Sequence, residues 1–285
     1  LIHDQGLGIE RTPQQAIAMF TKAAKKGHVA AQLELGYRYY EGRGVSRNPR
    51  TSKMWFERAA INAHPSAQYN LGLALLNGWG VSADASKSIK WFELAARNNC
   101  HEAQLMMAYA RKQGIGCQAN TDEAIQWAIK AANSGMSQAQ LALAFWYYDD
   151  QTEPNNRFEG LKWFELAAKQ GVVEAQLFLA SAFFEGNGIR QSNTKALEWF
   201  EKAAALGSAE AQLALGLLSL KASRSSEAID WLNLAAEKDL SEAQLLLGNL
   251  YRTGEGCDED LSQACFWYEK AALAGLPEAQ IWLGI

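Results

Sequence analysis

The residue types best suited to catalysis or metal binding are sparse in this chain, and their spacing forms no known site. The four histidines are His3, His28, His64 and His101, of which His28 and His64 hold the same position of a repeated segment. A repeated position favours a structural or solvated role. The chain contains no HExxH zinc motif, no GxSxG nucleophile elbow and no Walker phosphate loop. We therefore expect a non-catalytic protein without a metal or cofactor.

The cysteines also lack the spacing of a metal or redox site. No CxxC pair occurs among the four cysteines, so zinc and thioredoxin-like chemistry are not indicated. Cys117, Cys257 and Cys265 fall at positions that hold Val, Ile or Leu in other parts of the chain, which predicts small buried hydrophobic residues. A bridge between Cys257 and Cys265, which flank one loop, stays open, and the redox compartment is undetermined.

Two further motifs only partly match ligand sites. Asp258-Glu259-Asp260 lacks the spacing of an EF-hand calcium loop. Repeated Gly-x-Gly turns resemble part of a dinucleotide fingerprint, but they follow predicted helices and not strands. We interpret the acidic run in part as a helix cap and the glycine turns as helix ends.

The elements that position these residues repeat with a fixed period. The dipeptide Ala-Gln occurs eight times, at intervals of 36 residues with a single interval of 32. Its alanines are Ala31, Ala67, Ala103, Ala139, Ala175, Ala211, Ala243 and Ala279. A constant period of this length indicates a solenoid of stacked supersecondary units. Repeated residues then hold the units together, and function depends on the residues that vary.

Each unit is predicted to be a pair of helices. The first helix, about 29–41 in one unit, has apolar residues on a 3.6-residue period and ends at Gly42-x-Gly44, since glycine readily closes the last turn. The second helix begins after a residue that can cap the first turn. These predicted caps are Thr12, Asn48, Asp84, Asn120, Asn156, Ser192 and Asp260.

A tryptophan recurs in the second helix, opposite a stripe of small residues in the first. The tryptophans are Trp55, Trp91, Trp127, Trp163, Trp199, Trp231 and Trp267. The small positions are Gly36, Gly72, Ala108, Ala144, Ala180, Gly216, Gly248 and Gly284. We expect each indole to bury against this stripe, where two helices must approach closely. A leucine there would overpack the contact at a cost of roughly 1–3 kcal/mol.

Composition excludes several classes of partner. The chain has 27 basic and 31 acidic residues, net charge −4, with no Lys/Arg block, so a nucleic-acid partner is not expected. No apolar run reaches the ~20 residues of a membrane helix, so membrane insertion is not expected.

The chain starts at Leu1 within a repeat and ends at Ile285 within a helix, which we interpret as a fragment of a longer protein.

This pattern resembles the Sel1-like repeat family, whose 36-residue units are related to tetratricopeptide repeats. The matching residues in one unit are Ala31-Gln32, Leu35-Gly36, Tyr39, Gly42-x-Gly44, Trp55 and Ala59-Ala60. The resemblance covers essentially the whole chain and implies an all-α fold, a right-handed superhelical α/α solenoid forming one domain over 1–285. A cysteine-rich branch staples each repeat with a disulfide, and cysteines at that spacing are absent here.

The expected repeats follow from this register. The full repeats are 28–63, 64–99, 100–135, 136–171, 172–207, 208–239 and 240–275, with half-repeats at 1–27 and 276–285. Two turns depart from the pattern, at 149–154 and 221–226. Drift of a surface loop, a change of superhelix pitch and a partner contact all remain open for them. The loop aromatic Trp79 is equally open between packing and binding.

The resemblance implies that the first helix of each pair lines a concave face. Varying positions on that helix are then the candidates for partner binding: Glu34, Tyr37, Arg38, Glu41, Met106, Tyr109, Phe145, Trp146 and Phe178. Aromatic residues in the middle repeats and charges at one end suit an extended peptide or a partner helix. That Phe145 and Phe178 instead pack on the neighbouring hairpin stays open.

We therefore expect an interaction scaffold or adaptor that binds another protein or peptide and is itself monomeric. Family members imply a bacterial envelope, signalling or host-contact role, or an adaptor role in eukaryotic membrane-protein quality control. The location is undetermined, with a bacterial periplasmic or secreted one suspected and the cytoplasm also possible. The alternatives are a module that binds glycans or cell wall through exposed aromatic rings, and a hydrolase, as attributed to the cysteine-rich branch.

Overall fold

The structure is a computed structural model that describes residues 13–149 and 156–284. These residues form helices and connecting turns, and no strand occurs among them. The helices are α2 (Pro13–Lys25), α3 (Val29–Glu41), α4 (Pro49–Ile61), α5 (Pro65–Asn77), α6 (Ala85–Arg97), α7 (His101–Gln113), α8 (Thr121–Asn133), α9 (Ser137–Asp149), α10 (Asn156–Lys169), α11 (Val173–Glu185), α12 (Asn193–Ala205), α13 (Ala209–Lys221), α14 (Ser225–Ala236), α15 (Ser241–Thr253), α16 (Leu261–Leu273) and α17 (Pro277–Leu283).

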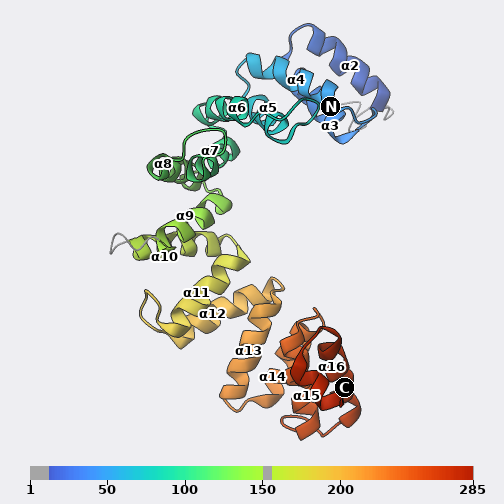
Figure 1. Cartoon of the computed structure of the whole chain (residues 1–285), viewed down its shortest axis with the longest axis vertical. Helices are drawn as coiled ribbons and strands as arrows, with labels where there is room; N and C mark the ends of the chain where they lie inside the picture. The colour runs from blue at the N-terminus through green and yellow to red at the C-terminus, as the bar shows by residue number, and fades with distance from the viewer. Residues whose placement is uncertain (1–12, 150–155, 285) are drawn as a thin grey trace, which may run out of the picture. The chain divides into compact units, whose positions relative to one another are not determined.

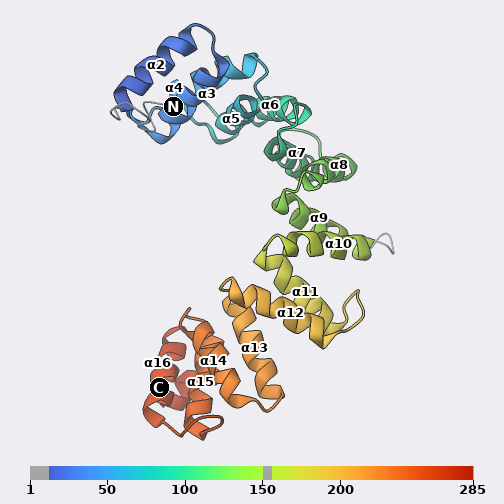
Figure 2. The same cartoon turned by 180° about the vertical axis from the view of Figure 1, so that it is seen from behind.

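The chain divides into two compact units, residues 1–143 and 144–285. Within each unit, consecutive helices pack on one another, as Figure 1 shows for α3 with α4 and for α15 with α16. The view from behind in Figure 2 shows the same pairing. The predicted all-α solenoid of stacked helix pairs is confirmed.

The second helices begin at capped residues, largely as the sequence predicts. The Asn48 and Asp84 side chains accept hydrogen bonds from the backbone N–H groups of Thr51 (3.0 Å) and Lys87 (2.9 Å). Asn120, Ser192 and Asp260 cap their helices in the same way. Two predicted caps differ. Asn156 is the first residue of α10, and Thr12 lies outside the described residues.

The glycine turns have two separate physical causes. Gly78 ends α5 with φ of 73°, a left-handed conformation that glycine adopts without the steric cost of a Cβ. Gly80 is needed for close approach, because a Cβ there would lie 2.5 Å from the backbone N of Arg50 at the start of α4. The second glycine therefore lets the turn of one repeat contact the preceding repeat.

The contact between paired helices corrects the predicted role of tryptophan. A Cβ built on Gly36 would lie 2.5 Å from Cδ1 of Phe56, the residue after Trp55. Gly72, Gly216 and Gly248 likewise face the residue after the tryptophan. That residue is buried in every pair: Phe56, Phe92, Ala128, Phe164, Phe200, Leu232 and Tyr268. The prediction that the indoles fill these gaps is wrong.

The tryptophans instead pack outside these gaps: Trp55 and Trp267 are buried in core clusters that contain Leu35 and Leu247, respectively. Trp91 and Trp163 are half-buried, whereas Trp55 and Trp199 are buried beneath basic side chains three residues later. Lys202 Nζ, for example, lies 4.1 Å from the centroid of the Trp199 ring. The indole thus contributes apolar area and a cation–π contact.

The repeated glutamine joins each repeat to the preceding one. Gln68 Nε2 donates a hydrogen bond to the carbonyl oxygen of Ala60 (3.3 Å), eight residues earlier, near the end of the preceding second helix. Seven further glutamines bond in the same way: Gln32, Gln104, Gln140, Gln176, Gln212, Gln244 and Gln280. All but Gln280 are buried, so the bond meets the hydrogen-bonding need of a polar group removed from water.

Candidate partner-binding surface

In the first unit, the predicted surface residue Tyr37 contacts an asparagine of the neighbouring first helix, Asn70. Asn70 Nδ2 on α5 donates to the hydroxyl of Tyr37 on α3 (2.9 Å) and to the Ser66 carbonyl (2.6 Å). The Tyr37 ring meets Phe56 edge-on, with centroids 5.3 Å apart. Because both amide hydrogens of Asn70 are donated within the chain, its side-chain carbonyl is the group it can offer to a partner.

A second tyrosine belongs to the same surface. Burial raises the pKa of Tyr37 on α3, and the nearby Cys100 and Glu102 raise it further. The hydrogen bond from Asn70 acts in the opposite direction and lowers this pKa. Burial, with Cys100 and Glu102, also raises the pKa of Tyr69 on α5. Both hydroxyls are therefore neutral at physiological pH and able to donate a hydrogen bond.

Cys100, which precedes α7, is a buried thiol of this region. Burial raises its pKa to about 11, and its Sγ donates to Glu102 Oε2 at 3.3 Å. A thiol of this kind is protonated at neutral pH and is a poor nucleophile. The region therefore offers polar recognition and no thiol chemistry.

Met106 and Tyr109 add apolar area from α7. Both are half-buried, and Met106 packs against the core cluster that contains Phe92 and Met107. A half-buried aromatic side chain supplies rigid contact area for a partner, and a flexible methionine can adapt to the partner's shape. The structure thus places these two predicted residues on the first-helix face without fully burying them.

The predicted charged end differs from expectation at Arg38. Its side chain is only 1% exposed; its Nε donates to Glu34 Oε1 at 2.8 Å, and its guanidinium lies 4.9 Å from the Phe20 ring centroid. A buried and paired arginine does not present its charge to a partner. Glu41 is exposed and forms an ion pair with Arg43. The surface charge at this end is therefore carried by Glu34, Glu41 and Arg43.

In the second unit, the predicted aromatic residues pack largely on one another. The Phe178 ring stacks on Phe164 at 3.8 Å between centroids, and Phe145 meets Phe164 edge-on at 4.9 Å. Tyr148, on α9 with Phe145, meets Phe178 edge-on at 4.7 Å. Phe145 and Phe178 remain half-buried, as does Trp146. Phe178 therefore packs on the preceding hairpin, in line with the open alternative, whereas Phe145 packs on Phe164 of its own hairpin and meets Phe178 of the next one at 5.9 Å between centroids.

The remaining features singled out in the sequence are the loop residue Trp79, the cysteines and the two irregular turns. Trp79 packs against Tyr40, with ring centroids 5.0 Å apart. All four cysteines are free; Cys265 is exposed, which corrects its prediction as a core residue, and Cys117 and Cys257 are half-buried. Of the two irregular turns, 221–226 joins α13 directly to α14 through Ser223 at φ 57°. Of the other, 149–154, only Asp149 is among the described residues, as the last residue of α9.

Neither a metal cluster nor a membrane-spanning helix occurs in the described part of the chain. No group of three or more His, Cys, Asp or Glu residues there could hold a metal ion. None of the helices over 13–149 and 156–284 has both the length and the apolar character needed to cross a bilayer.

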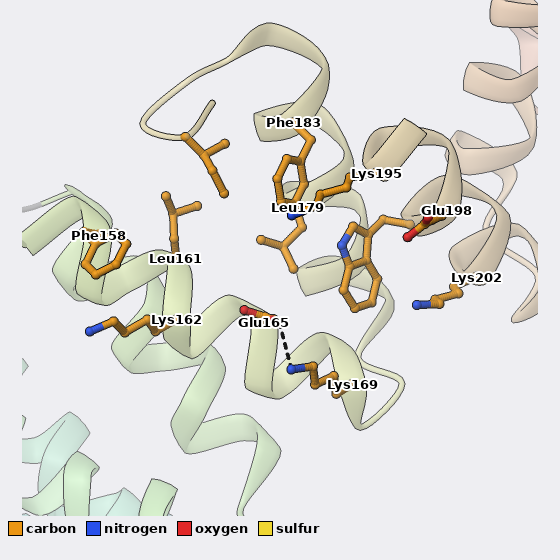
Figure 3. Close-up of a pocket in the computed structure, with 12 residues that line it drawn as sticks. Phe158, Leu161, Lys162, Glu165, Lys169, Leu179, Phe183, Lys195, Glu198 and Lys202 are labelled. Carbon is orange, nitrogen blue, oxygen red and sulfur yellow. Dashed lines mark ion pairs between the residues drawn. The ribbon is translucent and has the colours of Figure 1, made fainter. Parts of the chain in front are cut away.

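The sequence reasoning missed a pocket on the second helices of the second unit. It lies between α10, α11 and α12 and has a volume of about 430 Å³. Leu161, Leu179 and Phe183 form its apolar floor, and four lysines stand at its rim (Figure 3). One signal in the sequence points to it: Phe158, at its edge, holds a position that is polar in the other repeats, for example Ser86 and Asp122.

Comparison with known proteins identifies the repeats. A family model described as Sel1 repeat matches the chain at residues 1–28, 29–64, 65–100, 101–136, 137–172, 173–208, 209–240 and 241–276. No curated protein sequence matches.

Two solved structures are similar over nearly the whole chain. One is c5321, described as a protective antigen present in uropathogenic Escherichia coli strains and displaying an SLR fold; identity is 28% and TM-score 0.78, over 99% of this chain and 62% of c5321. The other is a Sel1 repeat protein from Oxalobacter formigenes, with 32% identity and TM-score 0.73, over 95% of this chain and 79% of that one. This chain thus spans less than two thirds of c5321.

Proposed function

The chain belongs to the Sel1 repeat family, and from this premise we propose that it is a non-catalytic scaffold that binds a protein partner along the surface of its first helices. Sel1-repeat proteins are generally protein-interaction scaffolds and typically non-catalytic. The partner contributes an extended peptide or a helix that lies across successive first helices.

The observation that carries this proposal is the contrast between two sets of residues. The glutamine bonds and the buried positions opposite the small stripe recur from repeat to repeat. The first-helix positions that are not fully buried differ: the position of Tyr37 holds Leu73, Tyr109, Phe145 and Ser181 in the following repeats. Variation at half-exposed sites, beside uniform packing, is what a surface specific for one partner requires.

The chemistry of the first unit fits a peptide backbone. Neutral hydroxyls on Tyr37 and Tyr69 can donate hydrogen bonds, and the Asn70 carbonyl can accept one. Met106 and Tyr109 offer apolar contact area beside them. An extended peptide carries alternating donors, acceptors and side chains that these groups could satisfy.

Affinity purification tests the proposal. The tagged chain and the Tyr109→Ala/Trp146→Ala variant are used to capture proteins from a lysate of the source organism, and bound proteins are identified by mass spectrometry. The control is Ile61→Ala, an exposed apolar residue on a second helix. We expect the wild type and the control to retain the partner. The double variant should lose at least about tenfold in affinity, because it truncates one or two binding hot spots.

Circular dichroism of each variant establishes that the helices are retained. Equal recovery of the partner by the double variant would contradict the proposed surface. Binding on a glycan array that survives the same substitutions would support a glycan-binding module in its place. Because the similar protein c5321 is described as a protective antigen, we also propose an envelope or host-contact role, which fractionation of the source cells would test.

A further inference from the structure

We propose that the pocket between α10, α11 and α12 binds an acidic peptide segment that inserts a large apolar side chain. The pocket is built mainly on second helices and lies outside the first-helix surface proposed above. The two proposals therefore fail independently.

The floor of the pocket is apolar. Leu161, Leu179 and Phe183 are buried beneath it, Trp199 forms part of one wall, and Phe158 stands at the edge (Figure 3). The volume of about 430 Å³ lies within the range of about 300–1,000 Å³ found for ligand pockets. A phenyl or indole side chain can enter such a space and bury most of its area.

Phe158 is exposed to 59%, although it is a large aromatic residue. Its position is occupied by Arg50, Ser86 and Asp122 in earlier repeats, and by Thr194, Ser226 and Ser262 in later ones. The ring contacts the Lys162 ammonium group, 4.5 Å from its centroid, on its own helix. That contact leaves most of the ring in water, and a ligand seated in the pocket would cover it.

The rim carries a net positive charge, because four lysines and two glutamates, Glu165 on α10 and Glu198 on α12, line the pocket. On α10, Lys162 and Lys169 form ion pairs with Glu159 (2.7 Å) and Glu165 (2.8 Å). On α12, Lys195 and Lys202 form no ion pair within the described part of the chain. Their ammonium groups lie 5.1 Å and 4.1 Å from the Phe183 and Trp199 ring centroids.

An earlier repeat shows how the same positions can be satisfied internally. Arg111 and Glu123 lie 72 residues before Phe183 and Lys195, hence at equivalent positions, and form an ion pair of 3.0 Å. At the pocket, an apolar ring replaces the arginine and a lysine replaces the glutamate. The exchange removes an internal charge pair and leaves a cation beside an apolar floor.

The net positive charge of the pocket rim favours an acidic occupant. The chain as a whole carries a net charge of −4, so the excess of lysines at this pocket is a local feature. Carboxylates on either side of an inserted aromatic residue would meet Lys195 and Lys202 while the ring covers Phe158 and Phe183. Protein interfaces commonly have an apolar anchor at the centre and complementary charges at the rim.

Fluorescence anisotropy with synthetic peptides tests this. The probes are fluorescein-labelled peptides in which Phe, Trp or Leu is flanked on each side by Asp-Glu, together with the same peptides flanked by Lys-Arg or carrying Ala at the centre. We expect saturable binding of the acidic peptides with a large central residue, and weak or no binding of the basic and Ala-centred peptides.

The matched variants are Lys202→Glu and Lys130→Glu, which reverse a lysine at equivalent positions. Each lysine lies 4.1 Å from the tryptophan three residues before it, and only Lys202 lines the pocket. We expect Lys202→Glu to weaken the acidic peptide by about tenfold, as an exposed attraction becomes a repulsion of similar size. Lys130→Glu should leave the affinity unchanged.

A third variant, Phe158→Ser, introduces a residue found at this position in other repeats, so the fold should tolerate it. It should weaken the acidic peptide while leaving the helical circular dichroism signal unchanged. The proposal is overturned if none of the acidic peptides binds saturably, if basic peptides bind equally well, or if Lys202→Glu and Lys130→Glu behave alike.

Discussion

At the scale of single residues, the turn after each second helix requires a positive φ, and different residue types adopt it in different repeats. Five of these turns use glycine with φ between 84° and 91°. Three others place Ala63, Asn99 and Asp239 at φ of 60° or 61°. Alanine costs roughly 1–2 kcal/mol in this conformation, whereas asparagine and aspartate can hydrogen-bond locally and adopt it more readily, so the turns differ in strain although their geometry is similar.

We predict that Ala63→Gly stabilises the chain by about 0.5–1 kcal/mol, because relief of the left-handed strain exceeds the added entropy of unfolded glycine. The converse change, Gly135→Ala, should destabilise it by about 1 kcal/mol. A Cβ at Gly135 would have no atom within 4 Å, so backbone strain is the only cause. Urea unfolding of the two variants measures both effects; a neutral Gly135→Ala would contradict the argument.

At the scale of helices, the repeated glutamines show that one residue type can be satisfied to different degrees. Gln68 donates to the Ala60 carbonyl at 3.3 Å and accepts from Asn98 Nδ2 at 3.1 Å. Gln176 donates to the Ala168 carbonyl at 3.0 Å, but its Oε1 is buried with no partner in the described residues. The same repeat position therefore contributes differently to the joints between repeats.

Replacement by leucine should reveal this difference. Gln68→Leu removes two hydrogen bonds and should cost about 2 kcal/mol, whereas Gln176→Leu removes one and also relieves a buried unsatisfied oxygen. We expect the second substitution to cost less by about 1 kcal/mol. Denaturant unfolding of both variants gives the comparison. Equal losses would show that the second bond of Gln68 is not a source of stability.

At the scale of the whole molecule, each compact unit consists of helices that contact their neighbours in the chain. In such an arrangement stability is approximately a sum of terms within repeats and between adjacent repeats. Substitutions at one joint should therefore be independent of those at another joint, while substitutions within one contact should be coupled.

Double-mutant cycles in the first unit test this expectation. Gly36→Ala alone overpacks the Phe56 ring and should cost about 1–3 kcal/mol. Combined with Phe56→Ala, which reproduces the Ala108 and Ala128 combination of a later repeat, it should cost less than the sum of the single changes by at least about 1 kcal/mol. Combined with Gln104→Leu, the effects should add within about 0.5 kcal/mol. Strong coupling in the second pair would contradict nearest-neighbour stability.

The candidate surface could be predicted only in part. Tyr37, Met106 and Tyr109 are half-buried on first helices, where the pattern and the family resemblance together placed them. Arg38 is buried against Phe20 and Glu34, and Phe178 stacks on Phe164. These outcomes depend on which side chains the neighbouring helices contribute to each contact. The sequence pattern of one helix does not contain that information. The α10–α12 pocket was missed for the same reason.

The sequence by itself determined the solenoid of helix pairs, most of the caps and the glycine turns, because these follow from local backbone chemistry repeated every 36 residues. Only the tertiary structure decided whether Trp55 or Phe56 enters the gap at Gly36. Adjacent residues on a helix are about 100° apart, so both lie near the apolar face, and the packing of the facing helix selects one. Only the tertiary structure, likewise, placed Trp199 and Lys202 in the lining of the α10–α12 pocket.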